Sequence, residues 1–345
     1  MPSPVRRWRL VIGVLAVALV AAACGSSSSS SGSSGQLSIV SIGDSIASGE
    51  GIAYGYTYDS AQPGPHWVGG VPNPTWSGPN QQCHQTTAAF GNVVAQDRKA
   101  KYLNLACSGS TYTNGIAEPW THPGFPQVPA QFGDWAAQTN LNPAYDQARP
   151  DVVLVTFGGD DVDFKDILVS CALGSKLDPN LCTAQDPGQT IQSDFFSQLG
   201  VLTQNYKTLA AGIQARGQAA KPAKVPFIVF TSYPNPLPPA SADISLTACP
   251  DVAGLGRAQI QYVSSLVQMQ VQTLRQAVGG MKGVAVSDIS GALAGHELCS
   301  PNPWAYGASV LLLNPDSGAP SHPTAQGQQA IANIVLKSVP SSPSG

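Results

Sequence analysis

Short apolar segments alternate with longer amphipathic segments along most of the chain. The short ones are rich in Val, Ile, Leu and Phe and are bounded by Gly, Pro or polar residues, which predicts buried strands over 37–42, 101–106, 152–157, 225–230 and 283–286. The longer ones place apolar residues three and four positions apart, which predicts helices over 86–98, 129–138, 192–216, 256–278 and 324–338. This alternation predicts an α/β fold, a doubly wound three-layer sandwich of flavodoxin-like type around a parallel sheet of about five strands.

Small and polar residues follow the first three predicted strands. Parallel sheets bind ligands beyond the carboxyl ends of their strands, where the loops supply the chemistry. We therefore expect one site to be built from Gly43-Asp44-Ser45, Cys107-Ser108-Gly109 and Gly158-Gly159-Asp160-Asp161. Residues 54–80 are rich in Pro, Gly and aromatic residues and show neither the hydrophobic period of a helix nor that of a strand. This predicts a long loop near the end of the first strand.

The N-terminal segment has the pattern of an export signal. Three arginines precede the apolar run 10–23, which is too short for a stable membrane-spanning helix but suits a signal peptide. We predict a signal peptide over 1–24, a Ser/Gly linker over 25–36 and a single domain over 37–340. The sequence Ala21-Ala22-Ala23-Cys24 resembles a lipobox, which implies lipidation of Cys24 and a location in the cell envelope. The alternative is an ordinary secretory signal and an extracellular protein.

Charge and cysteine content narrow the classes of function. Charged residues make up 11% of the 345 residues and the formal net charge is -3, so no basic surface favours nucleic acid. Six cysteines remain besides Cys24, and an even number in an exported chain implies disulfides whose connectivity the sequence leaves open. We expect neighbours to pair, as Cys83–Cys107, Cys171–Cys182 and Cys249–Cys299. No CxxC spacing favours a structural zinc site.

The turn Gly43-Asp44-Ser45 is a candidate for nucleophilic chemistry. Ser-His hydrolysis requires a hydroxyl at a tight turn, an imidazole that takes its proton, and donors aimed at the developing oxyanion. Ser45 follows the first predicted strand and satisfies the first requirement. The tripeptide alone is equally compatible with a plain helix cap.

Read together with three later segments, this turn resembles the GDSL, or SGNH, hydrolase family. The four matching blocks occur in the family's order, at residues 42–51, 104–110, 156–162 and 321–327, and the similarity extends over 37–338. The six cysteines, with Gly295-His296-Glu297-Leu298-Cys299-Ser300 and Trp304, resemble the three-disulfide branch of secreted actinobacterial esterases and lipases. The resemblance implies the flavodoxin-like SGNH hydrolase fold and ester hydrolysis without a metal or another cofactor.

The resemblance also implies the roles of individual residues. Ser45 is the expected nucleophile and first oxyanion donor, Gly109 the second donor, and His322 the general base. Where the family has Asn as a third donor, this chain has Asp160. An ionised carboxylate only accepts hydrogen bonds, so we expect Asp160 either to stay protonated or to point away from the oxyanion.

The acid that usually orients the histidine is also replaced. The family places Asp three residues before the histidine, and here that position is Ala319. Two arrangements are open: a triad in which Asp316 is the acid, or a dyad in which the backbone carbonyl of Ala319 or Pro320 accepts from the imidazole. The other histidines are expected to be structural or solvated.

These residues together predict an exported serine esterase or lipase that acts through an acyl-enzyme on Ser45. A carbohydrate O-acetyl esterase is the alternative among enzymes. A catalytically silent envelope protein that binds a lipid or glycan is the alternative from another class, which the replacement at Asp160 leaves open. The expected partner is an ester substrate, either an acyl lipid or an acylated glycan. We expect a monomer that contacts a membrane only through a lipid on Cys24.

Overall fold

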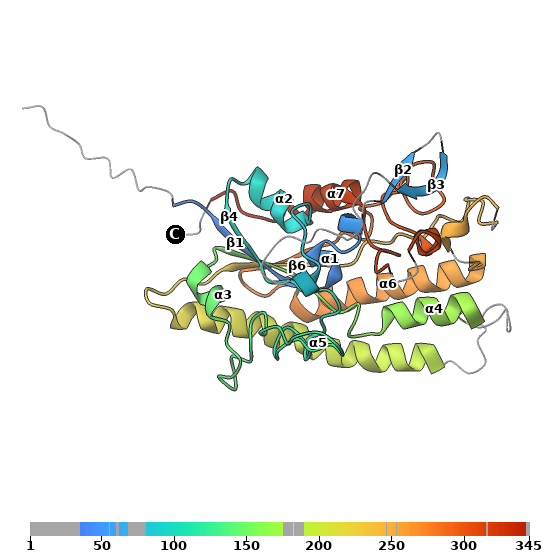
Figure 1. Ribbon diagram of the computed structural model, residues 1–345. Helices are drawn as coiled ribbons and strands as arrows, with labels where there is room; N and C mark the ends of the chain where they lie inside the picture. The colour runs from blue at the N-terminus through green and yellow to red at the C-terminus, as the bar shows by residue number, and fades with distance from the viewer. Residues whose placement is uncertain are drawn as a thin grey trace, which may run out of the picture. The chain divides into compact units, whose positions relative to one another are not determined.

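Five parallel strands form the central layer of the protein. The structure is a computed structural model that describes residues 35–54, 56–59, 62–67, 81–174, 182, 190–245, 247–252, 254–314 and 317–342. The sheet has the order β4-β1-β5-β6-β7. Figure 1 labels β4, β1 and β6 of this sheet. Its strands are β1 (Ser38–Gly43), β4 (Lys101–Asn104), β5 (Val152–Thr156), β6 (Phe227–Thr231) and β7 (Val284–Ser287). Each confirms a predicted strand, with small shifts at the ends.

Both faces of the central strands are buried, which explains their continuous apolar sequences. Along β1, Val40 and Ile42 pack into one hydrophobic layer, whereas Ile39 packs into the opposite layer. The neighbouring strand β5 alternates in the same way, with Val153 in the first layer and Leu154 in the second. A strand of this kind is apolar at most positions because helices cover both sides of the sheet.

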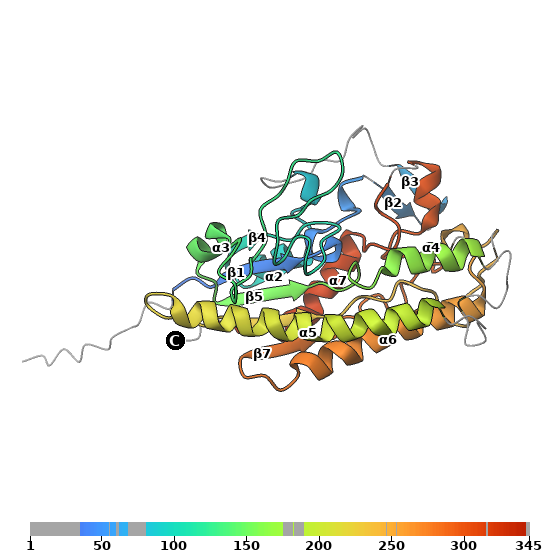
Figure 2. The same ribbon diagram turned by 90° about the horizontal axis from the view of Figure 1, so that it is seen from below.

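Seven α-helices are present in the described part of the chain, and they form the outer layers. On one face lie α3 (Pro143–Ala148), α4 (Phe164–Gly174), α5 (Thr190–Ala219) and α6 (Arg257–Val278), with α5 and α6 side by side (Figure 2). On the other face lie α1 (Ser45–Ser48), α2 (Phe90–Asp97) and α7 (Ala325–Val335). Short 3-10 helices occur at η1 (Ile52–Tyr54), η2 (Gln81–Cys83), η3 (Pro250–Val252) and η4 (Ala308–Leu312). The predicted α/β three-layer sandwich is therefore confirmed.

The helix predicted over residues 129–138 is wrong. This segment is an irregular loop, and the helix that follows, α3, begins only at Pro143. Gly133 has a φ of +92°, and a Cβ there would lie 2.5 Å from the Asn140 carbonyl oxygen. The apolar spacing misled the prediction because Ala130 and Phe132 are buried from a loop and not from one face of a helix.

The loop predicted over residues 54–80 contains two strands. β2 (Tyr56–Asp59) and β3 (Gln62–Trp67) pair antiparallel as a separate two-stranded sheet. β3 includes Pro63 and Pro65, which cannot donate to a ladder and argue against a central strand. A two-stranded ribbon consists only of edges, and prolines are tolerated there.

Three disulfides are present among the described residues. They join Cys83 to Cys107, Cys171 to Cys182 and Cys249 to Cys299, the pairs expected from the sequence.

Within the part of the chain that the structure describes, no helix combines the length and hydrophobicity needed to cross a bilayer. The same residues include no group of three or more His, Cys, Asp or Glu side chains placed to hold a metal ion.

Candidate active site

Ser45 opens helix α1 immediately after strand β1. The side chain of Asp44 caps this helix by accepting from the Ile46 N–H at 3.0 Å. The preceding Gly43 has a φ of +153°, and a Cβ there would lie 2.0 Å from the Thr156 carbonyl oxygen of β5. Only glycine permits this close approach of the two strands, so Gly43 fixes where the half-buried Ser45 leaves the sheet.

A buried glutamine holds this turn. Gln131 accepts from the Gly43 N–H at 2.7 Å and donates to the Gly43 carbonyl at 2.8 Å. The same amide donates to Ser110 Oγ at 3.0 Å, in the loop that follows β4. The first and second loops are therefore fixed relative to each other. The sequence pattern did not indicate Gln131, which lies in the segment predicted to be a helix.

The second loop reaches the same edge of the sheet. The Cys107 N–H donates to the Gly43 carbonyl at 3.0 Å, and the Ser108 N–H donates to the Cys83 carbonyl at 3.2 Å beside the Cys83–Cys107 disulfide. Gly109 follows with a φ of +76° and is exposed. The hydrogen bond to Gly43 thus holds the loop that carries Gly109 against the turn of Ser45, and the Cys83–Cys107 disulfide restrains its backbone.

The third loop brings acidic groups to this edge. The Gly159 N–H donates to the Tyr233 hydroxyl at 2.8 Å, and that hydroxyl donates to Asp44. Asp161 accepts from the Tyr112 N–H at 2.9 Å. One oxygen of Asp160, Oδ2, is buried with no hydrogen-bond partner among the described residues. An unpaired buried oxygen favours the protonated carboxyl at Asp160.

The carboxyl groups at this edge lie close to one another, and the charge of one raises the pKa of another. Burial raises the pKa of Asp160 to about 6 and that of Asp161 to about 7, with nearby carboxylates adding to both shifts. Burial also raises the pKa of Asp44 well above its usual value, and the charge of Asp160 contributes. Asp160 therefore carries a proton below about pH 6 and can then donate a hydrogen bond.

His322 lies on a short paired segment before α7. The Tyr306 N–H donates to the His322 carbonyl at 2.9 Å, and the neighbouring Ala305 bridges to Pro323. The imidazole Nδ1 lies 3.1 Å from the Pro320 carbonyl oxygen, a contact in which Nδ1 carries the proton and Nε2 is left as an acceptor. Burial lowers the pKa of His322, so the imidazole stays neutral into the acidic range.

The helix that follows His322 is tied to the helix that begins at Ser45. Gln328 of α7 is fully buried; it donates to the Ile46 carbonyl at 3.1 Å and accepts from the Phe90 N–H at 2.9 Å. The structure thus places all four sequence blocks at the carboxyl edge of the sheet. The Pro320 carbonyl lies at hydrogen-bond distance from the imidazole, and the carbonyls of Gly318 and Ala319 also favour its protonated form. The Ala319 carbonyl accepts from the His322 backbone N–H as well. Asp316 and Cys24 lie outside the described residues.

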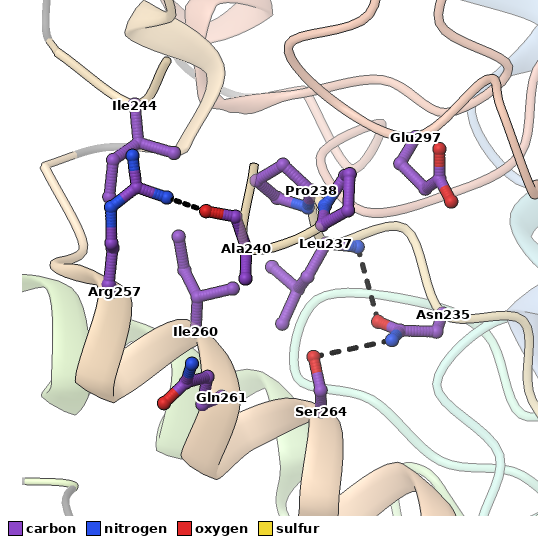
Figure 3. Close-up of a pocket in the computed structure, with 11 residues that line it drawn as sticks. Asn235, Leu237, Pro238, Ala240, Ile244, Arg257, Ile260, Gln261, Ser264 and Glu297 are labelled. Carbon is purple, nitrogen blue, oxygen red and sulfur yellow. Dashed lines mark hydrogen bonds between the residues drawn. The ribbon is translucent and has the colours of Figure 1, made fainter. Parts of the chain in front are cut away.

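A cavity of about 390 Å³ lies elsewhere, between the segment after β6 and the first turns of α6 (Figure 3). Several of its polar side chains pair with groups around them. Asn235 donates to Ser264 at 3.2 Å, and Arg257 donates to the Ala242 carbonyl at 2.9 Å. None of the predicted site residues lines this cavity, so we do not include it in the candidate active site.

Comparison with known proteins identifies relatives along nearly the whole domain. Residues 41–330 match the GDSL-like lipase/acylhydrolase family. A lipase from Streptomyces rimosus is 25% identical over 292 residues, which cover 84% of this chain and 81% of that protein. The crystal structure of the extracellular lipase from Streptomyces rimosus covers 88% of this chain and 100% of its own, with 20% identity and a TM-score of 0.50. Phospholipase A1 from Streptomyces albidoflavus NA297 covers 87% and 97%, with 18% identity and a TM-score of 0.50.

Proposed function

The chain belongs to the GDSL-like lipase/acylhydrolase family and is a carboxylic ester hydrolase, and we propose that it acts through an acyl-enzyme on Ser45 with His322 as the base. The observation that carries this proposal is the contact of His322 Nδ1 with the Pro320 carbonyl, which leaves Nε2 to accept a proton. The hydrogen bond from Gln328 to the Ile46 carbonyl links the helix after His322 to the helix that begins at Ser45, which supports the pairing of Ser45 with His322.

The proposed reaction has two stages. Ser45 Oγ attacks the ester carbonyl carbon while His322 Nε2 takes the hydroxyl proton. The carbonyl oxygen becomes an oxyanion, which accepts hydrogen bonds from the backbone N–H groups of Ser45 and Gly109 and from the O–H of protonated Asp160. The tetrahedral intermediate then expels the alcohol, which takes the proton from His322. In the second stage His322 deprotonates water, which attacks the acyl carbon, and the imidazolium returns the proton to Ser45 Oγ as the bond to the acyl group breaks and the acid is released.

A fluorophosphonate probe tests this proposal directly. The probe reacts with an activated serine, so we expect the wild-type domain to be labelled and Ser45→Ala to remain unlabelled. Ser48→Ala is the matched control, because Ser48 lies on the same helix and its hydroxyl donates to the Ser45 carbonyl at 3.1 Å. A wild-type domain that is not labelled would favour a silent protein that binds a lipid or glycan. Labelling that persists in Ser45→Ala would place the nucleophile elsewhere.

We propose a dyad and not a triad. The Pro320 carbonyl fixes the imidazole tautomer without a carboxylate, so Asp316→Ala is expected to lower kcat/KM for p-nitrophenyl butyrate by less than about tenfold. Asp97→Ala, an exposed carboxylate on α2, serves as the control for the loss of one charge. A specific loss well above about tenfold in Asp316→Ala would establish Asp316 as the acid of a triad.

We also propose that the enzyme is exported, as a monomer, with a signal peptide over 1–24, a linker over 25–36 and the catalytic domain over 37–340. The three disulfides support this location because such bonds persist in oxidising compartments. The Streptomyces rimosus lipase, which is described as extracellular, gives further support. Lipid attachment at Cys24 would hold the enzyme at the cell envelope. The proposed substrates are carboxylic esters of lipids or, alternatively, O-acetyl groups of carbohydrates.

A further inference from the structure

A buried glutamate follows the proposed nucleophile by one helical turn. Glu50 is 2% exposed, and its backbone N–H donates to the Ser45 carbonyl at 3.0 Å. A carboxylate at this depth is costly unless hydrogen bonds and opposite charge compensate it. None of the roles proposed above for the reaction involves this side chain.

Three donors surround the Glu50 carboxylate. His84 Nδ1 lies 2.5 Å from Oε2, the Gly51 N–H lies 3.3 Å from Oε1, and the Ser108 hydroxyl forms a further hydrogen bond. Burial alone would raise the pKa of Glu50, but the hydrogen bond from His84 and the proximity of His322 lower it below its usual value. Glu50 therefore carries a fixed negative charge.

The Glu50-Gly51 turn packs against the segment that holds His322. A Cβ on Gly51 would lie 3.1 Å from Cδ2 of Tyr306 and 3.4 Å from Cα of Ala319. Tyr306 is the residue whose N–H donates to the His322 carbonyl. The negative charge of Glu50 accordingly opposes the effect of burial on His322 and favours the imidazolium.

The proposed dyad leaves a charge uncompensated. His322 becomes an imidazolium when it takes the Ser45 proton, and a neutral carbonyl at Pro320 stabilises that cation less than a carboxylate would. The charged groups that interact with Glu50 are His84 and His322, and Asp160 also responds to its charge. Glu50 is thus an anion placed beside the site where the positive charge develops.

We propose that Glu50, hydrogen-bonded to His84, is a positioning residue that supplies the negative charge opposite His322 in place of the acid of a triad. This inference rests on the proposed function, in which His322 is the base. The imidazole then has two partners: the Pro320 carbonyl, which it contacts, and the charge of Glu50, which acts without direct contact. Glu50 acts through His322 and takes no part in bond formation.

The test is the pH dependence of kcat/KM for p-nitrophenyl butyrate in Glu50→Gln. Loss of the charge lowers the pKa of His322, so the acid limb is expected to move to lower pH by about one unit. The weaker base is expected to lower kcat by up to about tenfold. The alkaline limb is expected to move in the same direction, because Glu50 also raises the pKa of Asp160. Asp97→Asn, which removes one exposed charge, is expected to leave both limbs in place.

A second variant covers the case in which Glu50→Gln does not fold. His84→Gly keeps the carboxylate, removes its histidine donor and suits the positive φ of 51° at this position. It is expected to shift the acid limb in the same direction by a smaller amount. Folded variants that keep the wild-type acid limb would overturn the inference. Fluorophosphonate labelling of Ser45 separates the two failures: labelling with an unmoved limb rejects only the role of Glu50, and absent labelling rejects the proposed function.

Discussion

Replacing Ser45 by Ala is expected to lower kcat for p-nitrophenyl butyrate by about 10⁴- to 10⁶-fold, and replacing His322 by Ala by a similar factor. Both residues act in one step, since the hydroxyl becomes an effective nucleophile only as the imidazole takes its proton. The double variant is therefore expected to lose hardly more than either single variant. Steady-state kinetics of the three proteins, at a pH on the plateau of the wild type, measure this non-additivity.

Two comparisons make the result specific. Ser48→Ala removes a hydroxyl from the same short helix and is expected to keep kcat within a few-fold, because the Ser48 hydroxyl bonds to the backbone of its own turn. Thermal unfolding of every variant shows whether a loss reflects misfolding. Multiplicative losses in the double variant would mean that Ser45 and His322 act in separate steps, which the proposed mechanism does not allow.

The sheet could be predicted because burial on both faces requires short runs of apolar or β-branched residues, which are visible in the sequence. All five residues of β5 are buried and apolar or β-branched, so no other element fits this short run. Helix α4 carried a usable signal that the prediction did not use: Phe164, Ile167, Leu168 and Cys171 follow three- and four-residue spacing and contact the core. The loop around Gly133 was not predictable, since its burial depends on a distant backbone carbonyl at Asn140.

The candidate site could be predicted only as far as topology determines it. Loops after adjacent parallel strands meet at one edge, so the strand pattern alone predicts that Ser45, Gly109 and Asp160 gather there. The contacts that complete the site join residues far apart in sequence. Gln131 binds Gly43 across 88 positions, and no local pattern encodes such a hydrogen bond. The pairing of Glu50 with His84 is hidden for the same reason.

Replacing Asp160 by Asn is expected to raise kcat/KM by up to about 10²-fold at about pH 8 and to change it little at about pH 5. Burial raises the pKa of Asp160 to about 6, so the wild-type carboxyl donates to the oxyanion only in acid. Two units above that pKa about one molecule in a hundred keeps the proton. An amide donates at every pH, which predicts that the alkaline limb of the wild-type profile disappears in Asp160→Asn.

The sign of the same pKa shift predicts an independent change in stability. Because the pKa of Asp160 is raised on folding from 3.8 to about 6, the native state loses stability as the pH rises between these two values. Asp160→Asn is therefore expected to raise Tm fully above about pH 6, partly between these values, and not at lower pH. Asp161→Asn is the matched control: its amide oxygen can still accept from Tyr112, and no gain in rate is expected. A stability gain without a gain in rate at about pH 8 would mean that Asp160 is buried but points away from the oxyanion. An equal gain in rate at every pH would show that the wild-type carboxyl never donates, which contradicts its role in the proposed mechanism.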